Sequence, residues 1–296
     1  MKVLVFGSLN IDHTYRLAHL VRAGETLASG DYARSEGGKG LNQAVALARA
    51  GRETYFAGAI GEDGAFLKDF LALNGVNTAY IATLPVPTGH AIIQVDDAGQ
   101  NAILLFSGAN GSVSREQVLT TLDHFDAGDA VLLQNEINQL DFIMTEAARR
   151  GMRIILNPSP ITPALLNAPL HLTDTLILNE IEGKDITGET PPEAILDALR
   201  ARYPACHIVL TLGERGAFYA DQSQRMYQAA LPVEAADTTA AGDTFTGFFL
   251  HRFLTDGDAA RALREAACAA ALAVSRKGAA RSIPSAAETA RFPQAE

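Results

Sequence analysis

The sequence of 296 residues predicts an α/β fold: a mostly parallel central sheet with helices on both faces, plus a small β-sheet lid. Three observations predict this fold. Short apolar runs alternate with segments of helical period, which is typical of a parallel sheet covered by helices. Residues 12–36 and 88–107 break this alternation. The length and a hydrophobic content of 48% are sufficient for one large core.

The elements follow in order along the chain. The first strand is predicted at "KVLVFG", and "LNQAVALARAG" has apolar residues at 41, 44, 45, 47 and 48 before Gly51, which indicates an amphipathic helix. Next come a strand at "TYFAGAIG" and a helix at "GAFLKDFLALNG". Four buried strands are predicted at "AVLLQ", "RIILNPSP", "TLILN" and "HIVLTLG", separated by helical segments such as 138–150 and 191–202. Residues 240–276 are alanine-rich and predicted to be helical.

The two segments that break the alternation predict the small sheet. Residues 12–36 are too many for a plain connection between a strand and a helix. Residues 88–107 predict a hairpin that turns at Asp97-Ala98-Gly99. Ligands of open α/β folds bind beyond the carboxyl ends of the strands, so a small sheet placed there is expected to act as a lid. No repeat or linker is visible, and residues 1–296 are expected to form one domain.

Composition excludes several classes of function. The net charge is −10 without clusters of Lys or Arg, which argues against nucleic acid and membrane as partners. Cys206 and Cys268 lie far apart and outside any CxxC pattern, so neither a disulfide framework nor a zinc site is expected. A cytoplasmic location fits this cysteine usage. The apolar runs are too short for a signal peptide or a membrane span.

Polar residues follow predicted strands at several places, and these places are expected to meet at one edge of the sheet. Each also has an ordinary structural explanation, such as an Asx turn, a helix entry, a loop start, a capping box or a hairpin turn. Their joint position nevertheless predicts a cleft. The residues concerned are Asn10 and Asp12 in "GSLNID", Lys39 and Asn42 in "EGGKGLNQA", Glu136 in "LLQNEI", Asn179 and Glu182 in "LNEIEGKDITG", and Gly213 and Gly216 in "TLGERGAF".

The stretch "DTTAAGDTF" (237–245) places a carboxylate at the start of a predicted helix. Asp243 could cap that helix. Alternatively, it could take a proton from a substrate hydroxyl, since amides at a helix start attract anions. Together with the hydroxyl-binding residues, the helix start at Ala241, Gly242 and Asp243 suits a polyhydroxylated substrate and a polyphosphate. The sequence has no Walker A motif of the form GxxxxGK(S/T).

These motifs resemble those of the ribokinase-like sugar kinases, the phosphofructokinase-B family. "GGKGLNQAVALARAG" is similar to the N-terminal signature of the family and "DTTAAGDTFTGFF" to its C-terminal signature. The segments "GSLNID", "NPSP", "NEIEGKDITG", "TLGERG" and "RKGAARSIP" resemble the ribokinase branch in order and spacing. The resemblance covers nearly the whole chain. It implies the predicted fold and a β lid that mediates formation of a homodimer.

The resemblance also implies roles for individual residues. Asp243 would be the catalytic base, and the amides of Ala241 and Gly242 would form an anion hole for the γ-phosphoryl group. The sugar would be held by Asn10, Asp12, Gly38, Lys39, Asn42 and Glu136. ATP would lie along Asn179, Thr211, Gly213 and Gly216, and Glu182 would place Mg²⁺ through water. An activating K⁺ would be bound by Asp237, Thr239, Ala273, Arg276, Gly278 and Ser282.

Four positions depart from the usual residues of the family. Ala240 stands where the broad family usually has Gly, although ribokinase-type members often carry Ala. Ala267 replaces a common Asn near the adenine. Asn135 stands beside Glu136 where a smaller or apolar neighbour is expected, and Phe106 replaces a smaller residue in the lid. Asn135 and Phe106 are expected to reshape the sugar pocket.

The leading hypothesis is an ATP-dependent kinase of a free pentose, with D-ribose converted to ribose 5-phosphate. The Lys39–Asn42 form of the N-terminal motif favours this branch over fructokinases. A second hypothesis keeps the chemistry but changes the substrate to deoxyribose, another sugar or a nucleoside. A nucleoside kinase should present aromatic residues to stack on the base, and the lid offers few. A third is a catalytically silent sensor of sugar or nucleotide, against which the retained Asp243 counts.

Overall fold

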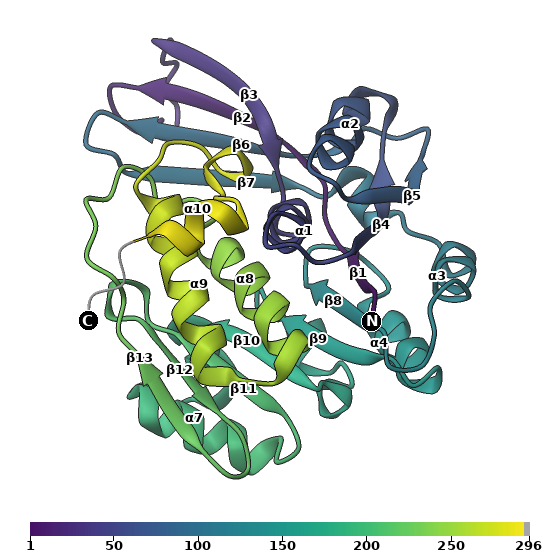
Figure 1. Ribbon diagram of the computed structural model, residues 1–296. Helices are drawn as coiled ribbons and strands as arrows, with labels where there is room; N and C mark the ends of the chain where they lie inside the picture. Colours follow the sequence, from purple (N-terminus) through teal and green to yellow (C-terminus); the bar gives the residue numbers. More distant parts are fainter. Residues whose placement is uncertain (293–296) are drawn as a thin grey trace.

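The computed structural model describes residues 1–292 and contains two sheets (Figure 1). The large sheet has nine strands in the order β13-β12-β11-β10-β9-β8-β1-β4-β5. Neighbouring strands are parallel except at β11–β12 and β12–β13. The predicted fold class is confirmed. The strands are β1 (Val3–Phe6), β4 (Thr54–Ile60), β5 (Asn77–Thr83), β8 (Ala130–Gln134), β9 (Arg153–Asn157), β10 (Thr175–Asn179), β11 (His207–Thr211), β12 (Ala217–Ala220) and β13 (Arg225–Gln228).

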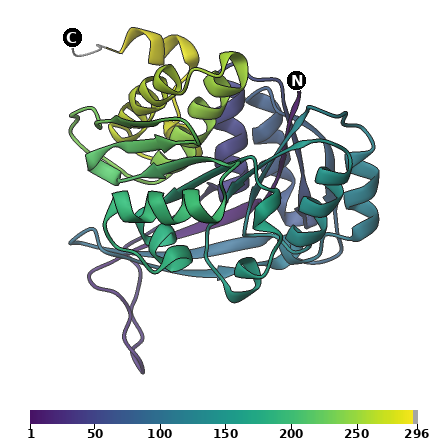
Figure 2. The same cartoon turned by 90° about the horizontal axis from the view of Figure 1, so that it is seen from below.

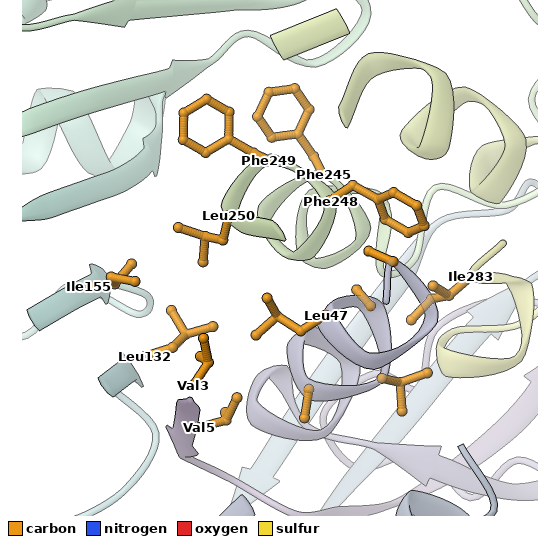
Figure 3. Close-up of a cluster of buried hydrophobic side chains, with 14 of the residues drawn as sticks. Val3, Val5, Leu47, Leu132, Ile155, Phe245, Phe248, Phe249, Leu250 and Ile283 are labelled. Atoms are coloured by element: carbon orange, nitrogen blue, oxygen red, sulfur yellow. The ribbon is translucent and has the colours of Figure 1, made fainter. Parts of the chain in front are cut away.

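Helices cover both faces of the large sheet, because alternate strand residues point to opposite faces. Val3 and Val5 pack with the side chains of α1, α2, α8 and α9, and Figure 3 shows Leu47 and Leu250 close to them. Leu4 and Phe6 pack with α3, α4, α6 and α7 on the other face. The helices are α1 (Lys39–Arg49), α2 (Ala65–Leu73), α3 (Arg115–Leu122), α4 (Leu140–Arg149), α5 (Pro163–Leu166), α6 (Glu180–Thr187), α7 (Pro192–Arg202), α8 (Ala241–Asp256), α9 (Ala259–Val274) and α10 (Ala286–Arg291).

The small sheet lies at one end of the molecule, at the top of Figure 1. Its strands, in the order β3-β2-β6-β7, are β2 (Asn10–Leu17), β3 (Asp31–Gly37), β6 (Gly89–Asp96) and β7 (Asn101–Phe106). The expected segments therefore do pair, with β2 parallel to β6 and the outer pairs antiparallel. The hairpin turns after Asp96, whose carbonyl oxygen accepts a hydrogen bond from the amide of Gly99. In Figure 2 the loop between β2 and β3 extends away from the body.

The prediction that residues 240–276 are helical is confirmed: they form α8 and α9, which are separated by a turn at Gly257, where φ is 74°. Other details differ from the sequence predictions. The strands β5, β12 and β13 were not predicted from the sequence. In "TLGERGAF", Gly213 begins a short 3₁₀ turn, η4 (Gly213–Arg215), and Gly216 directly follows it, so that the turn joins β11 to the antiparallel β12. The ordinary hairpin explanation of this motif therefore describes its backbone correctly.

Within residues 1–292, none of the helices is both long and apolar enough to cross a lipid bilayer.

Candidate active site

Asp243 lies at the start of α8 but does not cap that helix. The N-cap is Ala240, which has left-handed backbone angles with φ at 60°, and no side chain among residues 1–292 caps the helix there. Asp243 is only 8% exposed, and its carboxylate accepts hydrogen bonds from two side chains of α1. Asn42 Nδ2 donates to Oδ2 at 3.0 Å, and Gln43 Nε2 donates to Oδ1 at 2.8 Å. The capping explanation from the sequence is thus wrong, and the carboxylate is oriented by α1.

Gln43 belongs to this site although the sequence analysis did not select it. It is fully buried, and its Nε2 also donates to Asn157 Oδ1 at 3.0 Å. Its Oε1 accepts a hydrogen bond of 2.6 Å from Gln134 Nε2, which fixes the orientation of the amide. Gln43 lies one turn before the buried Leu47 on the apolar face of α1. A polar residue on an apolar face close to the strand ends is the signal that identifies it.

A cavity of about 220 Å³ lies at the start of α8. It unites residues predicted for catalysis with residues predicted for ATP. Gly213 and Gly216 follow Thr211 in the sequence, but neither lines this cavity. The lining includes Lys39, Asn157, Asn179, Glu182, Thr211, Ala240, Ala241, Gly242 and Asp243.

The backbone at the helix start is open to this cavity. Gly242 is exposed, and a Cβ atom at this position would meet nothing within 4 Å. The amide of Ala241 donates to the carbonyl oxygen of Thr238 at 3.2 Å. The predicted anion hole is therefore only partly formed, because one of its two amides has a partner in the preceding loop.

Lys39 lies between the two ends of the predicted cleft. It is the first residue of α1, and its backbone amide donates to Glu136 Oε2 at 3.1 Å. Burial alone would lower the pKa of the ammonium group, but Asp243, Glu136 and Glu182 raise it by more. Lys39 is therefore a retained positive charge rather than a solvated surface lysine.

The structure places only some of the predicted sugar residues together, since Asn42 contacts Asp243 and Lys39 lines the first cavity. Asn10 and Glu136 line a second cavity of about 360 Å³, together with Phe106 and Asn135. Asn110 was not selected from the sequence, but its Nδ2 donates to Asn10 Oδ1 at 2.8 Å. Asn10 is part of β2 rather than an Asx turn, so that alternative is wrong.

Burial and nearby charges shift the pKa values of two carboxyl groups predicted to bind the sugar, Glu136 and Asp12. Burial raises the pKa of Glu136. It does so although the Ser8 hydroxyl and the Lys39 amide donate hydrogen bonds to this carboxylate, which lower the pKa. Burial, and then the charges of Glu136 and Glu36, raise the pKa of Asp12 to about 7. The Asp12 carboxylate lies against Gly37, where a Cβ atom would come within 2.1 Å of it. A side chain at position 37 would therefore force the Asp12 carboxylate to move.

Asn179 and Glu182 form a complete capping box at the start of α6. The amide of Glu182 donates to Asn179 Oδ1, and the amide of Asn179 donates to Glu182 Oε2, both at 2.9 Å. The structural explanation of this pair is therefore correct. Both residues also line the cavity of about 220 Å³, so capping does not remove them from the site.

The residues predicted for a monovalent cation come from the loop before α8, the last turn of α9 and the segment that follows α9. Asp237 accepts hydrogen bonds from the amides of Thr239 at 2.9 Å and Gly278 at 3.0 Å. Burial alone would raise the pKa of Asp237, but these hydrogen bonds lower it overall. The carbonyl oxygen of Ala273 accepts from the amide of Arg276, and the hydroxyl of Ser282 donates to Ala279. Oxygen atoms and a carboxylate are a donor set that suits a hard cation.

The sequence matches the model of the pfkB family carbohydrate kinases over residues 1–286. The chain belongs to the pfkB family. It is therefore a phosphotransferase that uses an alcohol group as acceptor, and the resemblance seen in its motifs is confirmed.

Relatives in the pfkB family match over almost the whole chain. A ribokinase of Haemophilus influenzae is 36% identical over 300 residues, covering 97% of each protein. A deoxyribokinase of Salmonella typhi is 31% identical and covers 96% of each. The structure of Arabidopsis thaliana ribokinase complexed with ribose and ATP superimposes with a TM-score of 0.85 at 30% identity, covering 98% of this chain and 97% of that one.

Proposed function

We propose that this protein is an ATP-dependent kinase that phosphorylates the primary hydroxyl of D-ribose to give D-ribose 5-phosphate. The observation that carries the proposal is the position of Asp243. Its carboxylate lines the cavity at the start of α8, and Lys39 links that cavity to Glu136 in the second one. In this proposal the sugar occupies the second cavity, the phosphates occupy the first, and Asp243 serves as the base between them. The relatives named ribokinase and the complex with ribose and ATP support the choice of substrates.

The reaction needs alignment and charge stabilisation more than covalent chemistry. Asp243 takes the proton of the primary hydroxyl as its oxygen attacks the γ-phosphorus, and the bond to the β-phosphate oxygen breaks to release ADP. Asn42 and Gln43 keep the carboxylate aimed during this step. The amides of Ala241 and Gly242 and the ammonium group of Lys39 stabilise the charge on the transferring group.

The remaining side chains bind the two substrates. Asn10, Asp12, Gly38, Lys39, Asn42 and Glu136 hold the sugar, with carboxylates and amides that accept and donate hydrogen bonds to its hydroxyls. Asn179, Thr211, Gly213 and Gly216 lie along the nucleotide. Phe106 and Asn135 narrow the end of the sugar cavity.

Two cations fit residues of this chain. Glu182 lines the nucleotide cavity and would place Mg²⁺ through water, and Mg²⁺ when bound neutralises charge on the phosphates. Asp237, Thr239, Ala273, Arg276, Gly278 and Ser282 would surround K⁺, largely through carbonyl oxygens. K⁺ is large and weakly hydrated, so such oxygens can replace its water shell. The bound ion would order the loop before Ala241.

We further propose that the small sheet closes over the sugar as a lid and pairs with a second copy of the chain. The strand β7 supports this, since Ile103, Leu104, Leu105 and Phe106 are 50–66% exposed on an unpaired edge. Exposed apolar edges of this kind are usually covered in solution. Sedimentation of the wild type against Leu105→Asp tests the dimer. The site needs soluble metabolites, and we place the protein in the cytoplasm.

A coupled assay of ADP release tests the substrate. D-ribose should give the highest kcat/KM among pentoses, hexoses and nucleosides, with the phosphate on C5 by NMR. The second candidate is 2-deoxy-D-ribose, because a relative named deoxyribokinase matches nearly the full length. A higher kcat/KM for 2-deoxyribose would replace ribose with that sugar. Absence of sugar-dependent ADP release with every compound would overturn the kinase proposal.

A further inference from the structure

Arg281 and Glu36 form an ion pair between parts of the chain that lie 245 residues apart. Arg281 Nε donates to Glu36 Oε2 at 3.0 Å, and Nη2 donates to Oε1 at 2.8 Å. Both carboxylate oxygens are therefore held by one guanidinium, a geometry that fixes orientation as well as distance. Glu36 is only 7% exposed, whereas the side chain of Arg281 is 69% exposed. The hydrogen bonds from Arg281 lower the pKa of Glu36.

The Glu36 end of the pair belongs to the sugar site. Glu36 lies on β3 and pairs with Ile11 of β2, between the residues Asn10 and Asp12. The strand β3 ends at the next residue, Gly37, and Gly38 then forms the N-cap of α1. Movement of β3 therefore moves the backbone that leads into Lys39.

The Arg281 end of the pair is connected to the helix start at Ala241. Arg281 lies in the 3₁₀ turn η5 (Ala280–Ser282), shortly after Gly278. The amide of Gly278 donates to Asp237, which in turn accepts from the amide of Thr239. Thr239 belongs to the loop in which the Thr238 carbonyl oxygen holds the amide of Ala241 at 3.2 Å. A shift of this loop is needed before that amide can face a phosphate.

The pair does more than attach the turn η5 to the body. Solvent around the exposed Arg281 screens the pair, although Glu36 is buried and would lose its partner if Arg281 were replaced. The turn η5 is also fastened to α1 independently, because Arg49 Nη1 donates to the carbonyl oxygens of Ala280 and Ile283. Arg281 therefore orients the turn η5 relative to β3, whereas Arg49 attaches the turn to α1.

We infer that Arg281 and Glu36 are positioning residues that couple sugar binding to nucleotide binding. The inference rests on the proposed function. Bound sugar holds β3 in one position, and the ion pair then holds η5 in a matching position. Through Asp237, the position of η5 determines that of the loop before α8, which frees the amide of Ala241. Sugar binding therefore raises the affinity for the nucleotide, and by linkage the nucleotide raises the affinity for the sugar by the same factor.

Calorimetric titration with a non-hydrolysable ATP analogue, with and without saturating D-ribose, tests this coupling. In the wild type, ribose should tighten analogue binding by about 5-fold or more, a typical coupling. Arg281→Gln and Glu36→Gln should each reduce this coupling factor to within about 2-fold of 1. The coupling factor of the double variant should be no smaller than that of either single variant. Arg281 is largely exposed, so its replacement leaves no cavity, and Glu36→Gln tests the pair without leaving a buried carboxylate unpaired. The matched control is Arg225→Gln, which breaks an exposed pair with Asp197 elsewhere.

Retention of the full coupling factor in both single variants would overturn the inference. So would analogue affinities that fall equally with and without ribose, since this marks a merely structural role. A wild type that phosphorylates ribose yet shows no coupling overturns the inference alone. A wild type that binds no pentose overturns the proposed function as well.

Discussion

Gly247 of α8 lies directly against Ala46 of α1. A Cβ atom on Gly247 would come within 2.4 Å of the Ala46 Cβ and 2.7 Å of the Leu47 amide nitrogen. Each residue lies one helical turn beyond a member of the site, because Gly247 follows Asp243 by four positions and Ala46 follows Asn42 by four. The close approach of the two helices therefore sets the distance between Asp243 and its donors.

Gly247→Ala should separate α1 from α8 and lengthen the hydrogen bonds to Asp243. We expect a loss of about 1–3 kcal/mol in the free energy of unfolding, as for other overpacked cores. Because small misplacements of reacting groups are costly, kcat should fall by about tenfold or more. Urea unfolding and steady-state kinetics measure the two effects. Gly30→Ala is the control, since its nearest neighbour would be 3.8 Å away. Wild-type kcat in Gly247→Ala would show that helix spacing does not position the base.

Asp12 and Glu136 should act on the sugar rather than on ATP. Asp12→Ala and Glu136→Ala each leave sugar hydroxyls unpaired in a partly buried site, at a cost of about 1–3 kcal/mol. The KM for ribose should therefore rise by about 5–150-fold, while the KM for ATP changes by less than about 3-fold. Initial rates with each substrate varied in turn measure both constants. A similar loss for both substrates would mean that these residues act through folding.

The affinity for sugar should depend on pH through Asp12. Its pKa is raised to about 7, so the carboxylate becomes protonated just below neutrality and loses acceptor capacity. The KM for ribose should rise by about tenfold between pH 8 and pH 6, and Asp12→Asn should flatten this dependence. A pH profile of KM that is unchanged by Asp12→Asn would assign the titration to another group.

The stability of the ligand-free protein should show the opposite trend. The pKa of Asp12 in the folded state, about 7, lies above its ordinary value of 3.8, so folding takes up a proton between these values. The stability contributed by Asp12 is present at low pH and is lost as pH rises through about 7. Asp12→Asn should therefore raise Tm at pH 8 more than at pH 5. Equal changes in Tm at both pH values would contradict the raised pKa.

The activity should respond to K⁺ much more than to Na⁺. Rates at constant ionic strength, with K⁺ exchanged for Na⁺ or a bulky organic cation, measure this response. Asp237→Ala removes the carboxylate that holds Thr239 and Gly278, so it should lower both the rate and its dependence on K⁺ while sugar affinity stays nearly intact. Equal rates in all three salts would remove the cation site but leave the kinase reaction untouched.

Local patterns predicted much of the large sheet and the edge where the site forms. Buried strands such as "AVLLQ" and "TLILN" read clearly because both of their faces are covered. Polar residues that follow such strands must meet at one edge, which is why Glu136 and Asn179 could be placed. The edge strand β13 alternates between exposed and partly buried residues over only four positions, too short a signal to separate from a loop.

The partners of the site residues could not be predicted, because they depend on packing between distant elements. Asp243 was identified, but its contacts with Asn42 and Gln43 arise only when α8 lies against α1. The pairing of Arg281 with Glu36 likewise requires the tail to return to β3. Ala240 shows a local effect that the sequence did indicate. Its left-handed backbone, with φ at 60°, explains why glycine is the usual residue in the family.

Asp243 is the proposed base of an ATP-dependent ribose kinase. Rapid-quench measurement of a single turnover with ATP and D-ribose, in the wild type and in Asp243→Asn, tests this role most directly. The variant keeps the shape of the side chain and should bind both substrates within about 3-fold of the wild type. Its rate of phosphoryl transfer should fall by about 10²–10⁴-fold, the usual range for loss of a general base. A single-turnover rate within about 3-fold of the wild type would show that Asp243 is not the base.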